Sequence, residues 1–307
     1  MVIKTHLRNT AVKALCESMT VKVMIQLIRE LLPGYDLHKR MGFRETLSIP
    51  TANAARQIVD DICRAELFPD FVQLLVDTQE KGFKGRKYPI SYLSYIIHGM
   101  KTHGYMFDPD NRMFIEDSRV QQTQNWGVLR EGVDYEVTFL RFDIADNSHI
   151  VRSNPAKKVE RAYQDLFSIV TSALDRRNGR IWSFQGDGGL AAFCFSRKDQ
   201  QAVLAAVECL HELVLYNLGE KTISGPLAVR FAIHSGRCIY SSNTESLKKN
   251  DTVKDVVDIE HRFTRPGSCT ISQKAYITLD KRIADLFTPL KEKSIHNLYN
   301  YDAALVS

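Results

Sequence analysis

The hydrophobic pattern of the first third of the chain has the spacing of amphipathic helices. From Thr20 to Leu31 apolar residues recur every three to four positions, and the pattern stops at Pro33-Gly34. This spacing predicts one helix there, and similar spacing predicts three more, over 52–66, 71–78 and 91–103. Two short apolar runs, 105–107 and 113–115, flank Asp-Pro-Asp-Asn and predict a β-hairpin. Residues 1–118 are therefore interpreted as a small, mainly helical domain with a β-hairpin.

Helices followed by a hairpin are also typical of winged-helix DNA-binding domains. Such a domain needs a stripe of Lys and Arg on its recognition helix. This segment offers only a local cluster, at Lys81, Lys84, Arg86 and Lys87. We therefore favour a regulatory or docking role for residues 1–118 and do not expect nucleic acid as a partner.

The pattern changes in the second half of the chain. Residues 119–134 are polar and weakly patterned, which predicts a linker. From Tyr135 onward strand and helix patterns alternate. Strands are predicted over 137–142, 180–185, 190–195, 227–233, 238–241, 268–271 and 295–301, and helices over 154–175, 199–218 and 253–263. Strand–helix–strand–strand–helix–strand is the ferredoxin-like order, so residues 135–307 are predicted to form an α+β domain with its helices on one face of the sheet.

Composition narrows the class of protein. The 307 residues are 44% hydrophobic and 25% charged, which is ordinary for a globular protein. No apolar stretch is long enough to span a membrane, and the first residues lack the features of a secretory signal. The six cysteines are scattered and are interpreted as reduced thiols. A cytoplasmic protein without a membrane partner is expected, and its net charge of +5 suits an anionic ligand such as a nucleotide.

Two aspartates lie where a metal site is possible. Asp143 follows the first strand of the α+β domain, and Asp187 lies in the Gly-rich turn 186–189. In a ferredoxin-like sheet the first strand is central and the hairpin lies beside it, so the two carboxylates can meet. Mg²⁺ and Mn²⁺ prefer oxygen ligands and carry substrate phosphates, and the glycines allow the backbone to approach a nucleotide closely. The alternative is an Asp-Gly turn that only closes a hairpin.

A polar stripe follows the predicted helix near residue 258. Asp251, Asp255, Asp258 and Arg262 are separated by four, three and four positions, so they share one helical face. This face either is solvated, with an ion pair between Asp258 and Arg262, or lines an active site.

Taken together, five segments resemble the catalytic domain of class III nucleotidyl cyclases. The resemblance extends from Tyr135 to about Tyr301, and the five segments occur in the family's order and at similar spacing. They are FLRFDIADNS, RIWSFQGDGGLAAF, VRFAIHSGRCIY, DVVDIEHRFTRPGSCTISQKAY and LKEKSIHNLYNY.

The resemblance implies a metal-dependent reaction on a nucleoside triphosphate. It places two divalent ions, Mg²⁺ or Mn²⁺, on Asp143 and Asp187, with help from the carbonyl of Ile144. The ribose 3′-oxygen then attacks the α-phosphorus, and pyrophosphate leaves. Arg262 matches the arginine that stabilises the transition state, and Asp258 occupies the position of the asparagine that orients the ribose.

Two further implications concern the triphosphate and assembly. Lys291 falls at the position of the triphosphate-binding lysine, and Lys293 is equally placed. In this family the metal ligands and the arginine come from different subunits, so the resemblance implies a head-to-tail homodimer with active sites at the interface.

The base-reading positions depart from the common pattern. Ser183 stands where adenylate-forming members have lysine and guanylate-forming members have glutamate, while Asp251 matches the second base-reading position. Because Ser183 lies beside the bulky Trp182, both residues are expected to shape the base pocket. The combination looks most like the pyrimidine cyclases of bacterial Pycsar antiphage systems, which make cyclic UMP or cyclic CMP for a separate effector protein. UTP is the favoured substrate; an adenylate cyclase with an atypical base pocket and a catalytically inactive nucleotide-binding dimer remain alternatives.

Overall fold

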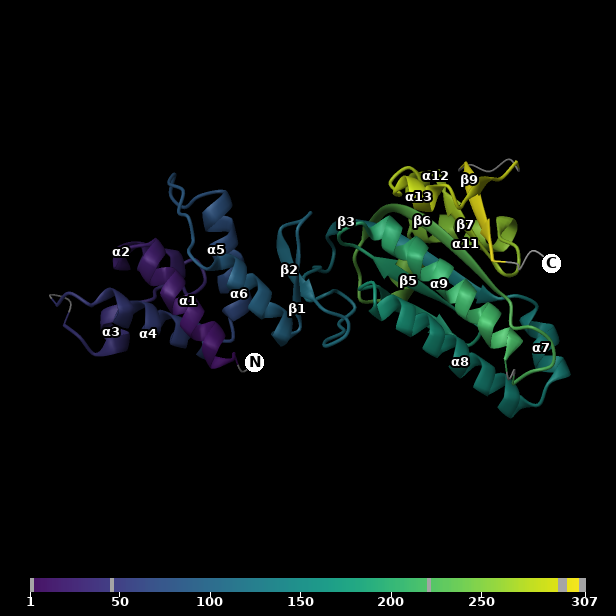
Figure 1. The fold of residues 1–307 in the computed structure, drawn as a ribbon, viewed down its shortest axis with the longest axis horizontal. Coiled ribbons are helices and arrows are strands. Elements are labelled where there is room, and N and C mark those ends of the chain that lie inside the picture. The colour runs from purple at the N-terminus through teal and green to yellow at the C-terminus, as the bar shows by residue number, and fades with distance from the viewer. Residues whose placement is uncertain (1–2, 45–46, 220–221, 292–296, 304–307) are drawn as a thin grey trace. The chain divides into compact units, whose positions relative to one another are not determined.

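The computed structural model describes residues 3–44, 47–219, 222–291 and 297–303. The chain divides into two compact units, 1–120 and 121–307, and each is described by itself (Figure 1).

The first unit is mainly helical and carries one hairpin. Its elements are α1 (Thr5–Ser18), α2 (Val21–Ile28), α3 (Leu37–Met41), α4 (Thr51–Arg64), α5 (Phe68–Glu80), α6 (Leu93–Met100), the 3₁₀ turn η1 (Lys101–His103), β1 (Tyr105–Asp108) and β2 (Met113–Glu116). The four predicted helices correspond to α2, α4, α5 and α6, and the antiparallel hairpin is confirmed. Helix α1 was not predicted, because its buried stripe, Leu7, Ala11, Ala14 and Leu15, is narrow and half alanine.

Helix α4 is the centre of the first unit, since α1, α2, α3 and α5 all contact it. Its apolar face is fully buried, and the same face carries one charged residue, Asp61, which is 3% exposed. Asp61 accepts hydrogen bonds from Tyr35 (2.8 Å), from Arg40 (3.2 and 2.5 Å) and from Gln57 (3.0 Å). A buried carboxylate with this many donors is a fully satisfied polar anchor for three segments of the unit.

The second unit is built around a seven-stranded sheet. Its strands are β3 (Asp134–Ile144), β4 (Arg180–Gln185), β5 (Gly188–Phe193), β6 (Val229–Ile239), β7 (Ser268–Ser272), β8 (Thr288–Pro289) and β9 (Leu298–Asp302). Its helices are α7 (Asn147–Ser153), α8 (Ala156–Asp175), α9 (Lys198–Leu218), α10 (Thr244–Lys248), α11 (Asp251–Phe263), α12 (Gln273–Tyr276) and α13 (Lys281–Ala284). The strand order is β4-β5-β3-β6-β7-β9-β8.

The ferredoxin-like prediction is confirmed by the order β4-β5-β3-β6, in which β3 is central and every neighbour is antiparallel. The two strands predicted over 227–233 and 238–241 are one strand, because β6 pairs without interruption with β3 from Val229 to Ile239.

Helices cover both faces of this sheet, so the prediction of helices on one face is incomplete. Helices α8 and α9 cover one face (Figure 1), where Leu140, Phe142 and Ile144 of β3 belong to the main core. The alternate residues of β3 point to the other face. There Arg141 lies 3.8 Å from Glu260 of α11, which places α11 on that face.

Residues 121–134, most of the linker predicted over 119–134, belong to the second unit. Trp126 is completely buried, donates its indole N–H to the carbonyl of Asn178 at 2.7 Å and meets Trp182 and Phe195 edge to face. The packing of Trp126 was not predicted because the residues around it are polar and show no regular hydrophobic pattern.

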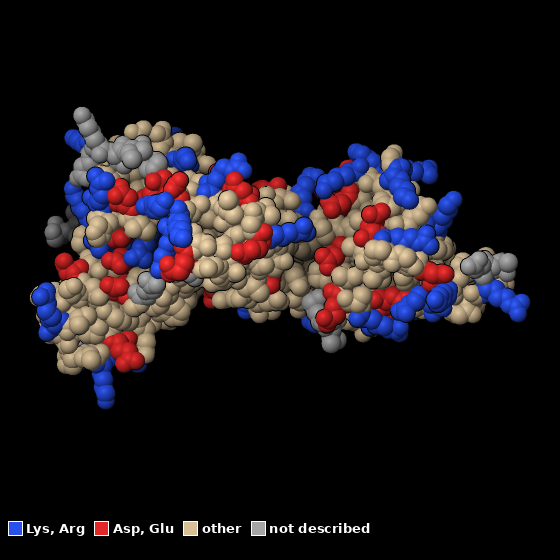
Figure 2. All heavy atoms as spheres, turned by 180° about the vertical axis from the view of Figure 1, so that it is seen from behind, with Lys and Arg blue, Asp and Glu red and all other residues tan. Residues whose placement is uncertain are grey.

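In the part of the chain that the structure describes, no helix is long and apolar enough to cross a membrane. On the face shown in Figure 2, basic and acidic side chains are interspersed.

Candidate active site

The fold brings Asp143 and Asp187 to the same end of two neighbouring strands. Asp143 is the penultimate residue of β3 and pairs with Gly188, the first residue of β5. Asp187 directly precedes that glycine, and its carbonyl accepts a 2.9 Å hydrogen bond from the N–H of Ile144. The expectation that strand end and hairpin tip meet is met by this backbone pairing.

The Asp187 carboxylate is held by a relay from α7 and α8. Asn147 donates its side-chain N–H to Asp187 Oδ2 at 2.8 Å, and Tyr163 donates its hydroxyl to Asn147 Oδ1 at 2.5 Å. The relay fixes the orientation of the amide, which in turn fixes one carboxylate oxygen of Asp187; within the described part of the chain no hydrogen bond is found to the other. Neither Asn147 nor Tyr163 was among the residues predicted for the site.

Two arginines that the sequence analysis missed hold Asp143. Arg141 Nη2 lies 3.2 Å from Asp143 Oδ1, and Arg230 Nη2 lies 2.8 Å from Oδ2. All three side chains are about one-fifth exposed, at 23%, 21% and 18%. The signal was Arg141 itself, because it lies two positions before Asp143, between the apolar Leu140 and Phe142, and therefore shares the face of Asp143.

A buried glutamate completes a four-charge cluster. Glu260 of α11 is 2% exposed, and its carboxylate lies 2.7 Å from Arg230 Nε and 3.8 Å from Arg141 Nε. Burial raises the pKa of Glu260, and the nearby Arg230 opposes that rise. Despite the short distance, Glu260 Oε1 and both Nε atoms have no hydrogen-bond partner in the described structure, because the groups are not aligned for one.

The donor set suits a divalent ion that prefers oxygen. Two carboxylates lie at one end of the β3–β5 ladder, where the N–H of Ile144 donates to the backbone carbonyl of Asp187. Among the described residues no group of three or more His, Cys, Asp or Glu side chains gathers at one point. Asp143, Asp187 and the Ile144 carbonyl can therefore hold an ion only together with substrate or water oxygens. Asp143 must also be released from its ion pairs with Arg141 and Arg230.

The predicted residues of α11 lie on its exposed face. Arg262 forms a 3.3 Å ion pair with Asp258 one turn away, and these side chains are 64% and 47% exposed. Asp251, at the start of the helix, pairs with Lys254 at 2.8 Å. Within the described residues, no hydrogen bond or ion pair joins this face to Asp143 or Asp187 of the same chain. The ion pair of the solvated-face interpretation is thus present.

The predicted base-pocket residues of β4 have different environments. Ser183 is partly exposed beside the β4 irregularity between Ile181 and Ser183. Trp182 is 3% exposed, donates its indole N–H to the Gln124 carbonyl at 3.1 Å, and packs against aromatic rings. Those rings belong to Trp126, Phe139 and Tyr240. Trp182 is therefore buried behind the strand, and its expected part in shaping the base pocket stays a prediction.

The predicted triphosphate-binding lysine, Lys291, lies exposed just after β8, and its alternative, Lys293, lies outside the described residues.

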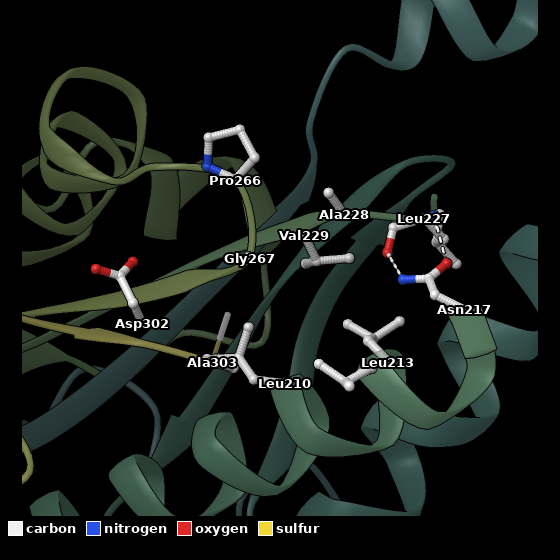
Figure 3. Close-up of a pocket in the computed structure, with 11 residues that line it drawn as sticks. Leu210, Leu213, Asn217, Leu227, Ala228, Val229, Pro266, Gly267, Asp302 and Ala303 are labelled. Atoms are coloured by element: carbon white, nitrogen blue, oxygen red, sulfur yellow. Dashed lines mark hydrogen bonds between the residues drawn. The ribbon is translucent and has the colours of Figure 1, made fainter. Parts of the chain in front are cut away.

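A small pocket of about 130 Å³ lies elsewhere in this unit (Figure 3). Its lining comes mainly from the end of α9, the start of β6 and the residues around β9, and Asn217 bonds both backbone groups of Leu227 there. It contains none of the predicted site residues, and it is smaller than the pockets of roughly 300 Å³ or more that hold small ligands.

Comparisons with known proteins give similar solved structures only. No family model matches the chain, and no curated protein matches it. The chain is similar to the catalytic core of a rhodopsin-guanylyl cyclase with converted specificity in complex with ATPαS, with 17% identity over 57% of this chain and 100% of that one, and a TM-score of 0.47. It is also similar to an adenylate/guanylate cyclase/hydrolase from Silicibacter pomeroyi, with 18% identity over 56% of this chain and 99% of that one, and a TM-score of 0.47. A third similar structure is the adenylyl cyclase CyaB from P. aeruginosa, with 14% identity over 57% of this chain and 97% of that one, and a TM-score of 0.45. Likeness at this level carries no statement about what this chain does.

Proposed function

We propose that the second unit is a metal-dependent nucleotidyl cyclase of the class III type, which converts a nucleoside triphosphate to a 3′,5′-cyclic nucleotide and pyrophosphate. The observation that carries the proposal is the pairing of Asp143 with Gly188 beside Asp187, which brings two carboxylates to one end of a ferredoxin-like sheet. The five sequence segments that resemble this family, in its order, support the same activity.

The residues have separate tasks in this reaction. Asp143, Asp187 and the carbonyl of Ile144 would hold Mg²⁺ or Mn²⁺, two ions per site, and the ions would supply activation of the ribose 3′-hydroxyl and charge neutralisation of the triphosphate. Lys291 binds the triphosphate as a point charge. Asp258 orients the ribose, and Arg262 donates to the α-phosphoryl oxygens, where negative charge increases in the transition state.

The position of Arg262 favours a homodimer. Its guanidinium is largely exposed, stacks 5.3 Å from the ring of Phe263 and pairs only loosely with Asp258. An arginine presented outward in this way can serve the metal site of a second copy of the chain. We therefore place each active site between two chains, with Asp143 and Asp187 from one and Arg262 from the other.

UTP is the favoured substrate. Ser183 is too short to make the contact with a purine that lysine or glutamate makes at its position, and Trp182 fixes β4 from behind, so the base pocket keeps a different shape. Asp251 offers a carboxylate to the base. The product, cyclic UMP, would act as a second messenger in bacterial antiphage defence and be read by a separate effector, with the first unit as a regulatory or docking domain.

The test is incubation of the purified chain with ATP, GTP, CTP and UTP in separate reactions with Mn²⁺, with products separated by chromatography. Cyclic UMP is expected from UTP, and Asp143→Asn should remove it. Cyclic AMP as the main product would support an adenylate cyclase with an atypical base pocket. Nucleotide binding without any product, in the wild type as in Asp143→Asn, would support the inactive nucleotide-binding dimer and overturn the proposal.

A further inference from the structure

The cluster of Asp143, Arg141, Arg230 and Glu260 is balanced in charge but not in hydrogen bonds. Two carboxylates face two guanidinium groups, and each arginine lies between both acids. The Nη2 atoms are engaged by Asp143, whereas both Nε atoms and Glu260 Oε1 lack aligned partners. This arrangement leaves hydrogen-bonding capacity unused on the Glu260 side. Buried polar atoms without partners lower the stability of a fold, so a rearrangement that pairs them is favoured.

We infer that Glu260 is a positioning residue for metal binding. It forms ion pairs with Arg141 and Arg230 when Asp143 releases them to bind a divalent cation. The inference rests on the proposed function, because Asp143 is the metal ligand there.

Charge explains why such a residue is needed. A cation that binds Asp143 removes the carboxylate that both arginines use, and two partly buried guanidinium groups would then repel each other and the metal. Glu260 is already within 2.7 Å of Arg230 Nε, so a small rotation of each guanidinium gains the unused Nε hydrogen bonds. The arginines therefore have a second anion to pair with, and the cost of releasing Asp143 falls.

The same arrangement identifies Arg141 as the weaker holder of Asp143. Its distances to Asp143 and Glu260 are 3.2 and 3.8 Å, against 2.8 and 2.7 Å for Arg230. Removal of Arg141 should thus relieve competition for Asp143 while Arg230 still neutralises Glu260.

The test measures Mn²⁺ binding to the full-length chain by calorimetry, without nucleotide, so that no step of catalysis enters. Glu260→Gln keeps the shape of the side chain and leaves the arginines with Asp143 as their only anion. We expect it to weaken Mn²⁺ binding by about tenfold or more, as loss of a partner around a metal ligand commonly does. The double variant Glu260→Gln/Arg141→Gln restores charge balance and should recover much of the affinity, which a merely structural role for Glu260 would not produce.

Three results separate the failures. If the wild type binds no Mn²⁺, or Asp143→Asn binds it equally well, the proposed metal site is wrong. If the wild type binds through Asp143 and a folded Glu260→Gln binds as tightly, or the double variant recovers nothing, the role of Glu260 is wrong. If Glu260→Gln does not fold, Arg141→Gln decides: tighter binding than wild type supports the inference, and equal or weaker binding overturns it.

Discussion

Gly188 lies directly opposite Asp143 in the β3–β5 ladder, and a Cβ atom on it would lie 2.6 Å from Asp143 Oδ1. The same atom would lie 2.6 Å from the carbonyl oxygen of Phe142. Both distances are far below van der Waals contact, and one of the obstacles is backbone. The sequence suggested that these glycines make room for a nucleotide, whereas at Gly188 the absent side chain first makes room for the carboxylate itself.

Gly188→Ala should therefore abolish metal binding at the candidate site while it lowers the stability of the second unit only moderately. Forcing a methyl group into this contact displaces Asp143 and costs about 1–3 kcal/mol of stability, as overpacking usually does. Urea unfolding followed by tryptophan fluorescence measures the second unit, which contains both tryptophans, Trp126 and Trp182. Mn²⁺ binding, measured on the folded variant, should be lost.

The matched control for Gly188→Ala lies two residues away. Gly186 has a φ of +58° and open space around its Cβ position, so Gly186→Asn meets no neighbour and adopts a conformation that asparagine tolerates. It should retain Mn²⁺ binding. Equal loss of binding in both variants would show that the turn, and not the Gly188–Asp143 contact, is what matters.

Tyr163→Phe should weaken metal binding without unfolding the protein. The change removes the 2.5 Å hydrogen bond that orients Asn147, which then holds Asp187 Oδ2 less firmly. Loss of such a supporting contact predicts a Mn²⁺ affinity about tenfold lower. Tyr299→Phe is the control, because the ring of Tyr299 stacks on Tyr276 and remains in place. Unchanged affinity in Tyr163→Phe would remove the relay from the site.

The ferredoxin-like part of the sheet, β4-β5-β3-β6, could be predicted because its elements follow local sequence patterns. The hydrophobic pattern predicts the strand over 137–142 and the long helix over 199–218, and the glycines predict the turn between two further strands. The order of these elements along the chain then indicates a ferredoxin-like sheet. Residues 121–134 could not be assigned in this way, because two isolated apolar side chains, Trp126 and Leu129, are buried in a polar segment without a regular pattern.

The site was only half predictable for a related reason. Asp143 and Asp187 are visible because a turn and a strand end are local features. Glu260 lies on α11 at a buried position, four residues after the core residue Val256, and a charge at such a position signals a partner. Which partner it meets depends on the register of β3 against β6, where Arg141 pairs with Ala232 two positions from Arg230, and sequence periodicity does not specify that register.

Two inactive variants should restore each other if the site forms between chains. Asp143→Asn lacks a metal ligand, and Arg262→Ala lacks the exposed arginine, so each homodimer has two defective sites. Mixed and re-equilibrated one to one, half of the dimers are heterodimers with one intact site, which predicts about a quarter of wild-type activity. The measurement is cyclic nucleotide formation before and after mixing; no recovery, with dimer exchange shown separately, would contradict sites shared between chains.

The first unit should lose stability in acid through Asp61. Burial alone would raise the pKa of Asp61, but hydrogen bonds from Arg40, Gln57 and Tyr35 outweigh burial and hold that pKa below its usual range. A depressed pKa in the folded state means that the carboxylate stabilises the fold fully above its ordinary pKa, about 3.9, and loses this effect as the pH falls through the folded value.

Asp61→Asn should consequently destabilise the first unit at neutral pH by roughly 2 kcal/mol, since a charged acceptor of several buried hydrogen bonds is replaced by a neutral one. Below the ordinary pKa of about 3.9 the difference between variant and wild type should shrink, because the unfolded wild-type chain binds a proton at this carboxyl before the folded protein does. Urea unfolding at pH 7 and pH 3, followed by far-UV circular dichroism, measures this difference. As a control, tryptophan fluorescence follows the second unit alone and should give the same unfolding transition for both proteins. If the difference in unfolding free energy between variant and wild type is equal at the two pH values, the carboxylate of Asp61 is excluded as its source.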